Sequence, residues 1–285
     1  MDGKGLAADI ESRLKAQAGK LKSSGIQPSL ATILVGNDPA SRVYVTSKHK
    51  AAERVGIASR GYHLGDQASR AELASLIESL NADDGVNGIL LQLPLPHHID
   101  ELNAIEQIDP EKDVDGLTTV NAGRLSYGQT ELVPCTPKGV MELLHNYRIP
   151  VRSSHVVIIN RSSLVGKPLH HLLLNEDATV TVCHSKSTDL RSLTSRADIL
   201  VTAVGKRPHF TVTEDMVREG AVVIDVATNR VEGKLVGDVD FDAVSRKASY
   251  ITPVPGGVGP MTVVMLIKNT LIATEKQNRL TVPVS

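Results

Sequence analysis

The stretch HVVIINRSSLVGKPLHHLLLNEDATVTVC, residues 155–183, carries the strongest indication of the fold. Apolar runs at 155–160 and 179–183 predict two strands, and the segment 168–175 between them predicts a helix. A strand, a helix and a second strand in this order are typical of a mononucleotide-binding unit with parallel strands. The polar turn after the first strand then lies where the amino terminus of a helix meets phosphate.

The same alternation of strands and helices extends over most of the chain on both sides of this stretch. The predicted strands are residues 30–35, 88–93, 198–204 and 221–226, and the predicted helices are residues 6–21, 40–55, 69–81 and a final run that ends near Lys276. We therefore predict an α/β protein with largely parallel sheets. The length of 285 residues favours two domains over one.

The composition disfavours several classes of function. A net charge of -1 and an aromatic content of 2% offer neither the positive field nor the stacking side chains of a nucleic-acid-binding protein. Two cysteines, Cys135 and Cys183, do not make the disulfide framework of a small secreted protein. No signal-like or membrane-spanning segment is recognisable. We expect a soluble, cytoplasmic protein whose partner is neither a nucleic acid nor a membrane.

The turn Asn160–Pro168 lacks the Gly-x-Gly-x-x-Gly pattern of many dinucleotide-binding folds. Its place between a buried strand and a helix nevertheless indicates a phosphate site. After the next strand, Ser185 and Lys186 occur where an NAD-dependent enzyme would carry an acid to bind the ribose hydroxyls. Together with Arg161 these residues suit a 2'-phosphate, so the sequence favours NADP over NAD.

Tyr44 and Lys48 lie four residues apart on a predicted helix and therefore share one face. A lysine that is desolvated in a cleft is a candidate proton-transfer group, and a neighbouring phenol can orient it. The alternative interpretation is a pair of side chains on an ordinary exposed helix. The Tyr-x-x-x-Lys pair of short-chain dehydrogenases follows their nucleotide-binding turn, whereas this pair precedes the nucleotide-like region.

Three further features have both a structural and a functional interpretation. Gln92, within an apolar run, is either a satisfied core amide or a ligand contact. The loop 109–116 lacks the acid spacing of a calcium loop, and is either solvated or presents one carboxylate to the ring nitrogens of a ligand. The stretch 253–260, with three glycines and three prolines, predicts a rigid loop that faces a ligand rather than the interior of an element.

No metal site is predicted. The pairs His97–His98 and His170–His171 consist of adjacent residues, which point to different faces of an element. Neither a His-Glu-x-x-His motif nor a Cys/His ligand spacing occurs. Cys135 has no paired base in its sequence surroundings, and we expect a buried thiol rather than a nucleophile.

Taken together, the motifs resemble those of the bifunctional methylenetetrahydrofolate dehydrogenase/cyclohydrolase (FolD) family over nearly the whole chain. The segments that carry the resemblance are residues 2–4, 44–48, 92–94, 110–116, 134–139, 161–168 and 253–262. The resemblance implies NADP-dependent oxidation of 5,10-methylenetetrahydrofolate to the 5,10-methenyl compound, followed by hydrolysis to 10-formyltetrahydrofolate in one-carbon metabolism.

The resemblance also implies the organisation of the chain. An N-terminal α/β substrate domain of residues 1–138, completed by residues 258–285, would bind folate. A Rossmann-like domain of residues 139–257 would bind NADP, and the C-terminal helix would return to the first domain, with folate in the cleft. A homodimer is usual in the family, and its chemistry requires no metal.

Individual roles follow from the resemblance in the same way. Lys48 would be the central catalytic residue, Tyr44 would stack on the folate and position the lysine, and Gln92 would support the lysine. Asp115 would anchor the pterin ring. The other expected folate contacts are Leu91, Leu93, Pro255, Gly256, Gly257, Val258, Gly259, Pro260, Met261, Thr262 and Val263, and the expected cofactor contacts are Asn160, Arg161, Ser162, Ser185 and Thr228.

Two departures from the family pattern concern the cofactor. Asn160 stands where glycine usually precedes Arg-Ser, and Ala227–Thr228 stand where Gly-Ile usually precedes Asn229. Asparagine enters the left-handed backbone region more readily than most residues, so we expect Asn160 to preserve the turn with its side chain beside the cofactor.

These departures leave one alternative from another class, a folate- or dinucleotide-binding protein with reduced or lost dehydrogenase activity. The retention of Tyr44 and Lys48 argues against it. A dehydrogenase of the shikimate type shares the order of domains, but the stretch 253–262 does not suit that enzyme.

Overall fold

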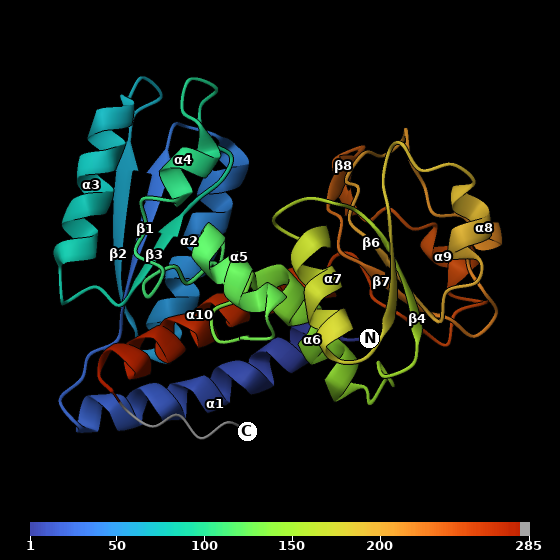
Figure 1. The fold of residues 1–285 in the computed structure, drawn as a ribbon, viewed down its shortest axis with the longest axis horizontal. Helices are drawn as coiled ribbons and strands as arrows, with labels where there is room; N and C mark the ends of the chain where they lie inside the picture. Colours follow the sequence, from blue (N-terminus) through green and yellow to red (C-terminus); the bar gives the residue numbers. More distant parts are fainter. Residues whose placement is uncertain (280–285) are drawn as a thin grey trace. The chain divides into compact units, whose positions relative to one another are not determined.

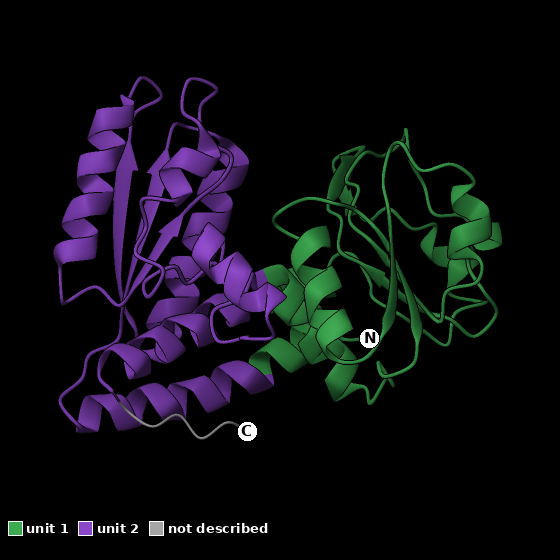
Figure 2. Ribbon diagram, in the orientation of Figure 1, with its two compact units in different colours: residues 1–8, 136–262 green, residues 9–135, 263–285 purple. Residues whose placement is uncertain are grey.

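The structure, a computed structural model that describes residues 1–279, contains two compact α/β units. Unit 1 comprises residues 1–8 and 136–262, and unit 2 comprises residues 9–135 and the chain from Val263 onward (Figure 2). Figure 1 shows the strands and helices that alternate within each unit. The predicted fold class, a two-domain α/β protein, is confirmed.

Unit 2 is built on a parallel sheet with the strand order β2-β1-β3 (Figure 1). The strands are β1 (Ser29–Val35), β2 (Ala58–Leu64) and β3 (Gly88–Leu91). Every residue of β1 is buried, as expected for the central strand of a parallel sheet. The edge strand β2 was absent from the predictions because its sequence, ASRGYHL, has no apolar run and its residues are exposed or only partly buried.

The helix α2 (Pro39–Val55) follows β1 and carries the predicted Tyr44/Lys48 pair. Its start is specified locally, because the Asp38 carboxylate accepts a hydrogen bond from the Ser41 backbone N–H at 2.7 Å and Pro39 occupies the first turn. Gly56, with φ of 90°, ends the helix in the left-handed conformation. The helix α3 (Arg70–Ala82) begins with a capping box formed by Ser69 and Glu72.

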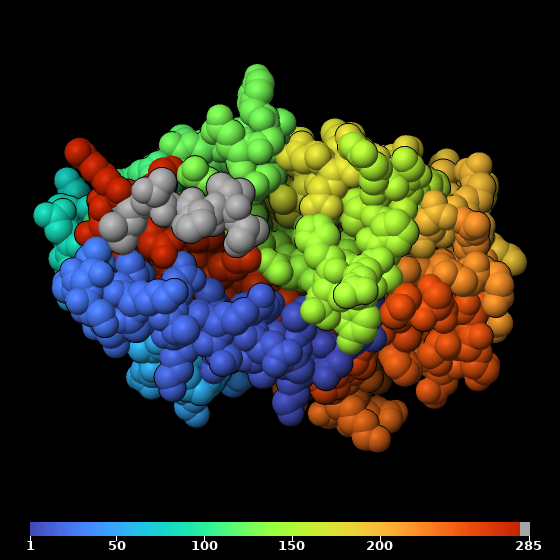
Figure 3. Space-filling model, turned by 90° about the horizontal axis from the view of Figure 1, so that it is seen from below, coloured from blue at the N-terminus to red at the C-terminus, as the bar shows by residue number. Residues whose placement is uncertain are grey.

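The parts of the first and last helices, α1 (Gly3–Ser23) and α10 (Val258–Gln277), that belong to unit 2 lie side by side (Figures 1 and 3). The side-chain amide of Gln17 donates a hydrogen bond to the carboxylate of Glu275 at 2.6 Å. Residues Leu266, Ile267 and Leu271 of α10 are buried. The expectation that the C-terminal helix returns to the first domain is therefore confirmed.

Several helices were not predicted from the sequence, among them α4 (Glu101–Ile105), α5 (Thr119–Ser126) and α6 (Cys135–Asn146). α4 and α5 begin at side-chain caps supplied by Asp100 and Thr118. α6 begins within the Pro134–Pro137 segment. Prolines mark turns in a sequence but are also tolerated in the first turn of a helix, so the Pro-rich start of α6 concealed it.

Unit 1 is built on a parallel sheet with the order β10-β7-β6-β4-β5. Its strands are β4 (His155–Ile159), β5 (Thr179–Cys183), β6 (Ile199–Thr202), β7 (Val222–Asp225) and β10 (Tyr250–Ile251). The chain passes from β4 to β5 on one side and then to β6 on the other side of β4. This reversal of strand order creates a crevice at the carboxyl ends of the strands, where dinucleotides bind in such sheets.

The remaining elements of unit 1 are short. They are the helices α7 (Gly166–Asn175), α8 (Leu190–Thr194), η1 (Glu214–Met216) and α9 (Phe241–Val244), and the antiparallel pair β8 (Asn229–Val231) and β9 (Lys234–Val236). Apolar residues from β4, β6 and β7, among them Val157, Leu200 and Val223, form the core of this unit.

Two sequence predictions are corrected by the structure. The strand predicted over 88–93 ends at Leu91, so Gln92 lies just beyond the strand rather than inside it. The stretch 253–260 is not entirely a loop, because α10 begins at Val258. Gly259 and Pro260 fit there since the first N–H groups of a helix have no partner within it, and proline lacks that group.

Candidate active site

A buried lysine and an amide form the centre of the candidate site in unit 2. Lys48 on α2 is only 9% exposed, and its Nζ donates a hydrogen bond to Oε1 of Gln92 at 3.0 Å. The Gln92 amide is oriented by its own backbone, because its Nε2 donates to the carbonyl oxygen of Leu93 at 2.6 Å. Oε1 is therefore directed at the lysine. The structure thus brings together Lys48 and Gln92, which are far apart in the sequence.

Asp115 adds a carboxylate whose charge interacts with that of Lys48. Burial raises the pKa of the Asp115 carboxyl, while the positive charge of Lys48 and a hydrogen bond from the Cys135 thiol oppose the rise. Cys135 is buried, and its thiol also contacts the carbonyl oxygen of Val114 at 3.5 Å. A lysine, an amide and a carboxylate with an elevated pKa are therefore grouped in one unit.

The turn that presents Asp115 is fixed from two directions. Gly116 has φ of 67°, and a Cβ atom there would lie 2.6 Å from the carbonyl carbon of Val133, so only glycine fits. The side-chain amide of Asn269, buried in α10, donates to the carbonyl oxygens of Val114 at 2.8 Å and Val133 at 2.9 Å. Asn269 was not singled out in the sequence, since an asparagine in an apolar helix shows no motif.

The acids of the 109–116 loop have different roles. Asp113 is buried, and its Oδ2 accepts hydrogen bonds from the backbone N–H and hydroxyl of Thr118 at 2.9 and 2.8 Å and from the Asn121 amide at 2.9 Å. Asp113 is thus a structural carboxylate that starts α5. Asp115 has no such set of backbone donors and remains the acid that suits a ligand. Spacing alone could not distinguish the two.

Tyr44 lies on α2 one turn before Lys48 and is 47% exposed. Within residues 1–279, no hydrogen bond joins the Tyr44 hydroxyl to Lys48, whose hydrogen-bond partner is Gln92. The exposed ring suits stacking on a planar ligand. Leu91 and Leu93 flank Gln92, Leu91 buried at the end of β3 and Leu93 partly buried.

The predicted glycine-rich folate loop lies in unit 1 up to Thr262, and Val263 is the first α10 residue of unit 2. The loop is braced by the first residues of the chain, because the Lys4 backbone N–H donates to the carbonyl oxygen of Gly256 at 2.9 Å. A Cβ atom on Gly3 would lie 1.8 Å from the carbonyl oxygen of Gly257. Glycine is therefore required at position 3 for this close approach.

At the carboxyl edge of the unit 1 sheet, Asn160 organises the turn after β4. Its Oδ1 accepts the backbone N–H groups of Ser162 at 2.7 Å and Gly166 at 3.0 Å, and its Nδ2 donates to the carbonyl oxygen of Ala203 at 2.6 Å. The expectation of a left-handed backbone at Asn160 is wrong, since Asn160 is not among the described residues with positive φ. The side chain preserves the turn instead, by capping its N–H groups.

The residues predicted to bind the 2'-phosphate lie at the same edge. Ile159 pairs with Cys183 in the parallel register of β4 and β5, so Arg161 and Ser185 each follow their strand by two residues. Both are exposed. Ser162 is partly buried and its hydroxyl accepts the Val165 backbone N–H at 3.1 Å. Within residues 1–279 the Arg161 guanidinium has no acidic partner, so this edge offers it and nearby hydroxyls to an anionic ligand.

A further cofactor-edge feature, which the sequence analysis missed, is a pair of buried carboxylates, Asp225 and Asp238. Both are at most 3% exposed. Burial raises the pKa of Asp225 to about 6, and the nearby negative charge of Asp238 adds to the rise. Thr228, another predicted cofactor contact, follows β7 and is exposed. In the sequence, Asp225 and Asp238 each occur singly among apolar residues, and that pattern does not indicate that the two carboxylates lie close together in the fold.

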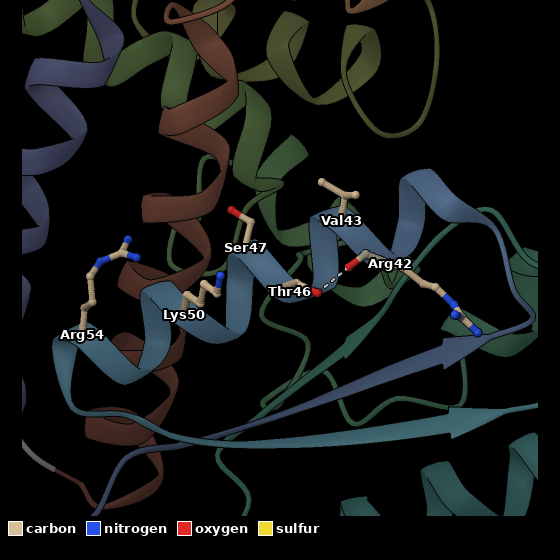
Figure 4. A pocket seen from close by; sticks show the side chains of 6 residues that line it. All are labelled: Arg42, Val43, Thr46, Ser47, Lys50 and Arg54. Carbon is tan, nitrogen blue, oxygen red and sulfur yellow. Dashed lines mark hydrogen bonds between the residues drawn. The ribbon is translucent and has the colours of Figure 1, made fainter.

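Figure 4 shows a pocket beside α2. It has a volume of about 420 Å³ and is lined by Arg42, Val43, Thr46, Ser47, Lys50 and Arg54. Lys48 and Gln92 do not line it, so this pocket is not the lysine site.

In the part of the chain that the structure describes, no group of three or more His, Cys, Asp or Glu side chains is arranged to hold a metal ion. No helix among residues 1–279 is long and apolar enough to cross a membrane.

Comparisons with known proteins were made for the sequence and for the fold. Residues 1–115 match the catalytic-domain model of tetrahydrofolate dehydrogenase/cyclohydrolase, and residues 134–278 match its NAD(P)-binding-domain model. The bifunctional protein FolD of Cenarchaeum symbiosum is 55% identical over 273 residues, which cover 96% of this chain and 97% of that protein.

Solved structures agree with the sequence matches. The bifunctional FolD enzyme of Campylobacter jejuni has a TM-score of 0.94 at 50% identity, with 98% of both chains covered. The FolD enzyme of Trypanosoma brucei, solved as a complex with NADP and an inhibitor, has a TM-score of 0.93 at 39% identity, again with 98% of both chains covered. The chain belongs to the tetrahydrofolate dehydrogenase/cyclohydrolase (FolD) family.

Proposed function

We propose that this chain oxidises 5,10-methylenetetrahydrofolate with NADP as the hydride acceptor and then hydrolyses the methenyl product to 10-formyltetrahydrofolate. The observation that carries the proposal is the hydrogen bond between the buried Lys48 and Gln92, with the Asp115 carboxylate in electrostatic contact with the lysine. Hydrolysis at the methenyl carbon needs a group beside it that can accept a proton from the attacking water. A lysine with a fixed amide partner and a nearby acid meets that need.

In the first step, a hydride leaves the methylene carbon of the folate for the nicotinamide, and a methenyl cation remains. In the second step, water attacks that carbon and loses one proton. The bond from the carbon to N5 then breaks, N5 takes up the remaining hydroxyl proton, and the carbon is left as the formyl group on N10. The Lys48 Nζ is the group proposed to accept the proton of the attacking water. The Gln92 carbonyl oxygen holds the Nζ in place throughout, because the other end of the amide is bound to Leu93.

Binding of folate would use Asp115 and Tyr44. A carboxylate accepts two hydrogen bonds in parallel from the amino group and a ring N–H of a pterin. The half-exposed ring of Tyr44 supplies an aromatic face for stacking. Residues 255–263, together with Leu91 and Leu93, complete the proposed folate contacts. The steric requirement at Gly3 supports a loop whose backbone position matters.

We assign the cofactor as NADP rather than NAD. Arg161 is exposed, has no acidic partner in the described part of the chain, and follows β4 at the edge where dinucleotides bind. Ser185 follows the neighbouring strand at the equivalent position. An arginine fork and a hydroxyl suit a 2'-phosphate, whereas the ribose hydroxyls of NAD are bound by an acid in many related folds. A homodimer is proposed by analogy with the family.

The experiment uses purified protein, 5,10-methylenetetrahydrofolate and either NADP or NAD. Reduced nicotinamide is followed by its fluorescence, and the methenyl compound by its absorption after acid quenching, because the absorption bands of the two overlap. We expect NADP-dependent reduction, with the methenyl band remaining small because hydrolysis removes it. Binding of both ligands without turnover would instead support the alternative, a folate- or dinucleotide-binding protein that has lost its dehydrogenase activity.

A further inference from the structure

We propose that Asp225 and Asp238 act together as positioning residues for the nicotinamide half of the dinucleotide, by fixing the loops that follow β6 and β7. The inference deepens the proposed NADP-dependent function and rests on it. Neither carboxylate needs to touch the cofactor. Their role is to hold the backbone of two adjacent loops at the sheet edge where the cofactor binds.

Asp238 holds the loop after β6. Its Oδ2 accepts hydrogen bonds from the Thr202 hydroxyl at 2.8 Å and the Val204 backbone N–H at 2.7 Å, and its Oδ1 accepts the Gly205 backbone N–H at 3.0 Å. Oδ1 also contacts the Asn229 amide at 3.2 Å. One fully buried side chain therefore fixes consecutive N–H groups at the carboxyl end of β6.

Asn229 links this first loop to the second. Its Oδ1 accepts the Arg207 backbone N–H at 2.9 Å, while its Nδ2 donates to Asp238. Arg207 belongs to the loop after β6, and Asn229, the first residue of β8, lies directly after Thr228 at the end of the loop after β7. A displacement of Asp238 would thus move both loops, because the amide connects them.

Asp225 holds the loop after β7. Its Oδ1 accepts the Ala227 backbone N–H at 3.1 Å, and its Oδ2 accepts the Val239 backbone N–H at 2.9 Å. The Thr252 hydroxyl, on the neighbouring β10 side, accepts the Asp225 backbone N–H at 2.7 Å. A Cβ atom on Gly237 would lie 1.9 Å from Asp225 Oδ2, so glycine is needed for the chain to pass the carboxylate. The carboxylate thus joins the β7 loop to the segment that carries Asp238.

This geometry points to the nicotinamide half of the cofactor. Arg161 and Ser185, which suit the 2'-phosphate of the adenosine half, follow β4 and β5. The loops held by the two carboxylates follow β6 and β7, on the opposite side of β4 in the strand order. A dinucleotide bound across the edge of such a sheet places one nucleotide over each half. Changes at Asp225 or Asp238 should therefore affect one half of the ligand and spare the other.

The charge on Asp225 depends on pH, and its surroundings determine how. The ionisable groups that line the small cavity beside it are Asp240, Asp242 and Arg207, and Asp238 lies behind it. Both backbone bonds of Asp225 run from N–H donors to carboxylate oxygens, so the ionised form holds the loop best. Protonation removes acceptor capacity and should loosen it.

The test compares two ligands on the full-length protein. Asp225→Asn and Asp238→Asn place an amide N–H against backbone donors, whereas Asp242→Asn changes an exposed acid that lines the same cavity and serves as the matched control. Dissociation constants are measured by calorimetry for NADP and for 2',5'-ADP, which lacks the nicotinamide half. We expect NADP to bind about tenfold or more weakly to the two variants, as for loss of a charge-assisted hydrogen bond, and 2',5'-ADP to bind unchanged.

The pH dependence of NADP affinity is a second test, because a purely structural role of Asp225 would not make the effect of Asp225→Asn depend on pH. The penalty of Asp225→Asn for NADP should shrink from neutral pH to about pH 5, where the wild-type carboxyl is itself protonated. The titration of the 2'-phosphate of NADP affects both proteins equally, so it cancels in the ratio of their NADP dissociation constants. If Asp225→Asn fails to fold, Thr252→Val, which loosens the same strand end, should give a smaller loss of the same kind.

Equal weakening of NADP and 2',5'-ADP would overturn the proposal, as would a lower melting temperature with unchanged NADP affinity. The proposal would also be contradicted if the ratio of the NADP dissociation constants of Asp225→Asn and the wild type did not vary with pH. Failure of the proposed function has a different signature, since the wild-type protein would then either bind neither NADP nor 2',5'-ADP, or bind NADP without oxidising methylenetetrahydrofolate.

Discussion

At Arg161, we expect an exposed side chain to determine the preference for NADP over NAD. We expect Arg161→Ala to raise the KM for NADP roughly tenfold while leaving the KM for NAD nearly unchanged, because a charge-assisted contact to the 2'-phosphate is lost. Initial rates with each cofactor give both values. Lys167→Ala, at another exposed residue of the same turn, is the matched control for a general loss of positive charge. A similar rise for both cofactors would remove Arg161 from the phosphate site.

Asp225 makes stability depend on pH in an unusual direction for an acid. Burial raises its pKa from the ordinary value of 3.8 to about 6, so the folded protein binds the proton more tightly than the unfolded chain. Its contribution to the free energy of unfolding is therefore present at low pH and is lost as the pH rises through about 6. Acids with a lowered pKa, such as Glu72 and Asp215, act in the opposite direction.

The Asp225 contribution can be isolated by comparison with Asp225→Asn. The free energy of unfolding of the wild type, relative to the variant, should fall by about 1 kcal/mol between about pH 5 and pH 7. Urea unfolding at a series of pH values measures both proteins. Parallel curves would show that Asp225 keeps the same pKa in the folded and unfolded states.

The first turn of α1 holds the Gly256–Gly257 loop in place, so this helix also positions a segment that lies far away in the sequence. Gly3→Ala would place a Cβ atom 1.8 Å from the Gly257 carbonyl oxygen, so the loop must shift. A displacement of about 1 Å at a reacting site can cost up to ~10²-fold in rate. We expect the KM for methylenetetrahydrofolate to rise by roughly an order of magnitude.

The control for that variant lies in the same helix. A Cβ atom at Gly19 meets nothing within 4 Å, so Gly19→Ala should leave the kinetics unchanged and stabilise α1 by about 0.5–1 kcal/mol. Steady-state kinetics and thermal unfolding of the two variants test the contrast. An unchanged folate KM in a folded Gly3→Ala protein would show that the loop position does not matter for binding.

How well an element could be predicted depended on how strongly its own sequence specifies it. The β4–α7–β5 stretch was predicted within one or two residues because β4 has a continuous, mostly buried apolar run and β5 is rich in β-branched residues. The edge strand β2 was missed, since pairing with β1 rather than its own side chains makes it a strand. α10 was predicted to begin too late, because Gly259 and Pro260 resemble a loop until their place in a first helical turn is known.

In the candidate site, too, the residues marked by a local pattern could be predicted, whereas those that act through distant contacts could not. Lys48 and Gln92 could be suggested from local pattern and resemblance, and the structure brings their side chains together. The supporting residues Asn269, Asp225 and Asp238 could not be found, since each acts through contacts with distant backbone groups. Asn160 was singled out for its backbone, but its side chain maintains the turn.

Over the whole molecule, the chain passes between the two units more than once. The divisions fall at 8/9 within α1, at 135/136 at the start of α6 and at 262/263 within α10. Neither unit is therefore a single continuous segment. Residues 1–8, which brace the Gly256–Gly257 loop, belong to the same unit as the NAD(P)-binding sheet.

For the enzyme as a whole, we propose that Lys48 activates water for hydrolysis of the methenyl cation. We expect Lys48→Met to reduce cyclohydrolase activity by ~10²- to 10⁴-fold, the typical contribution of a general acid or base, and dehydrogenase activity to fall less because hydride departure need not use a base. Lys50→Met, on another face of the same helix, is the control.

The most direct measurement is therefore the rate of methenyltetrahydrofolate hydrolysis by Lys48→Met, followed at the methenyl absorption band, with circular dichroism and folate binding to establish that the variant is folded. The account predicts that hydrolysis is lost while folate binding is retained. Near-normal hydrolysis by the folded variant would contradict it and remove Lys48 from the mechanism.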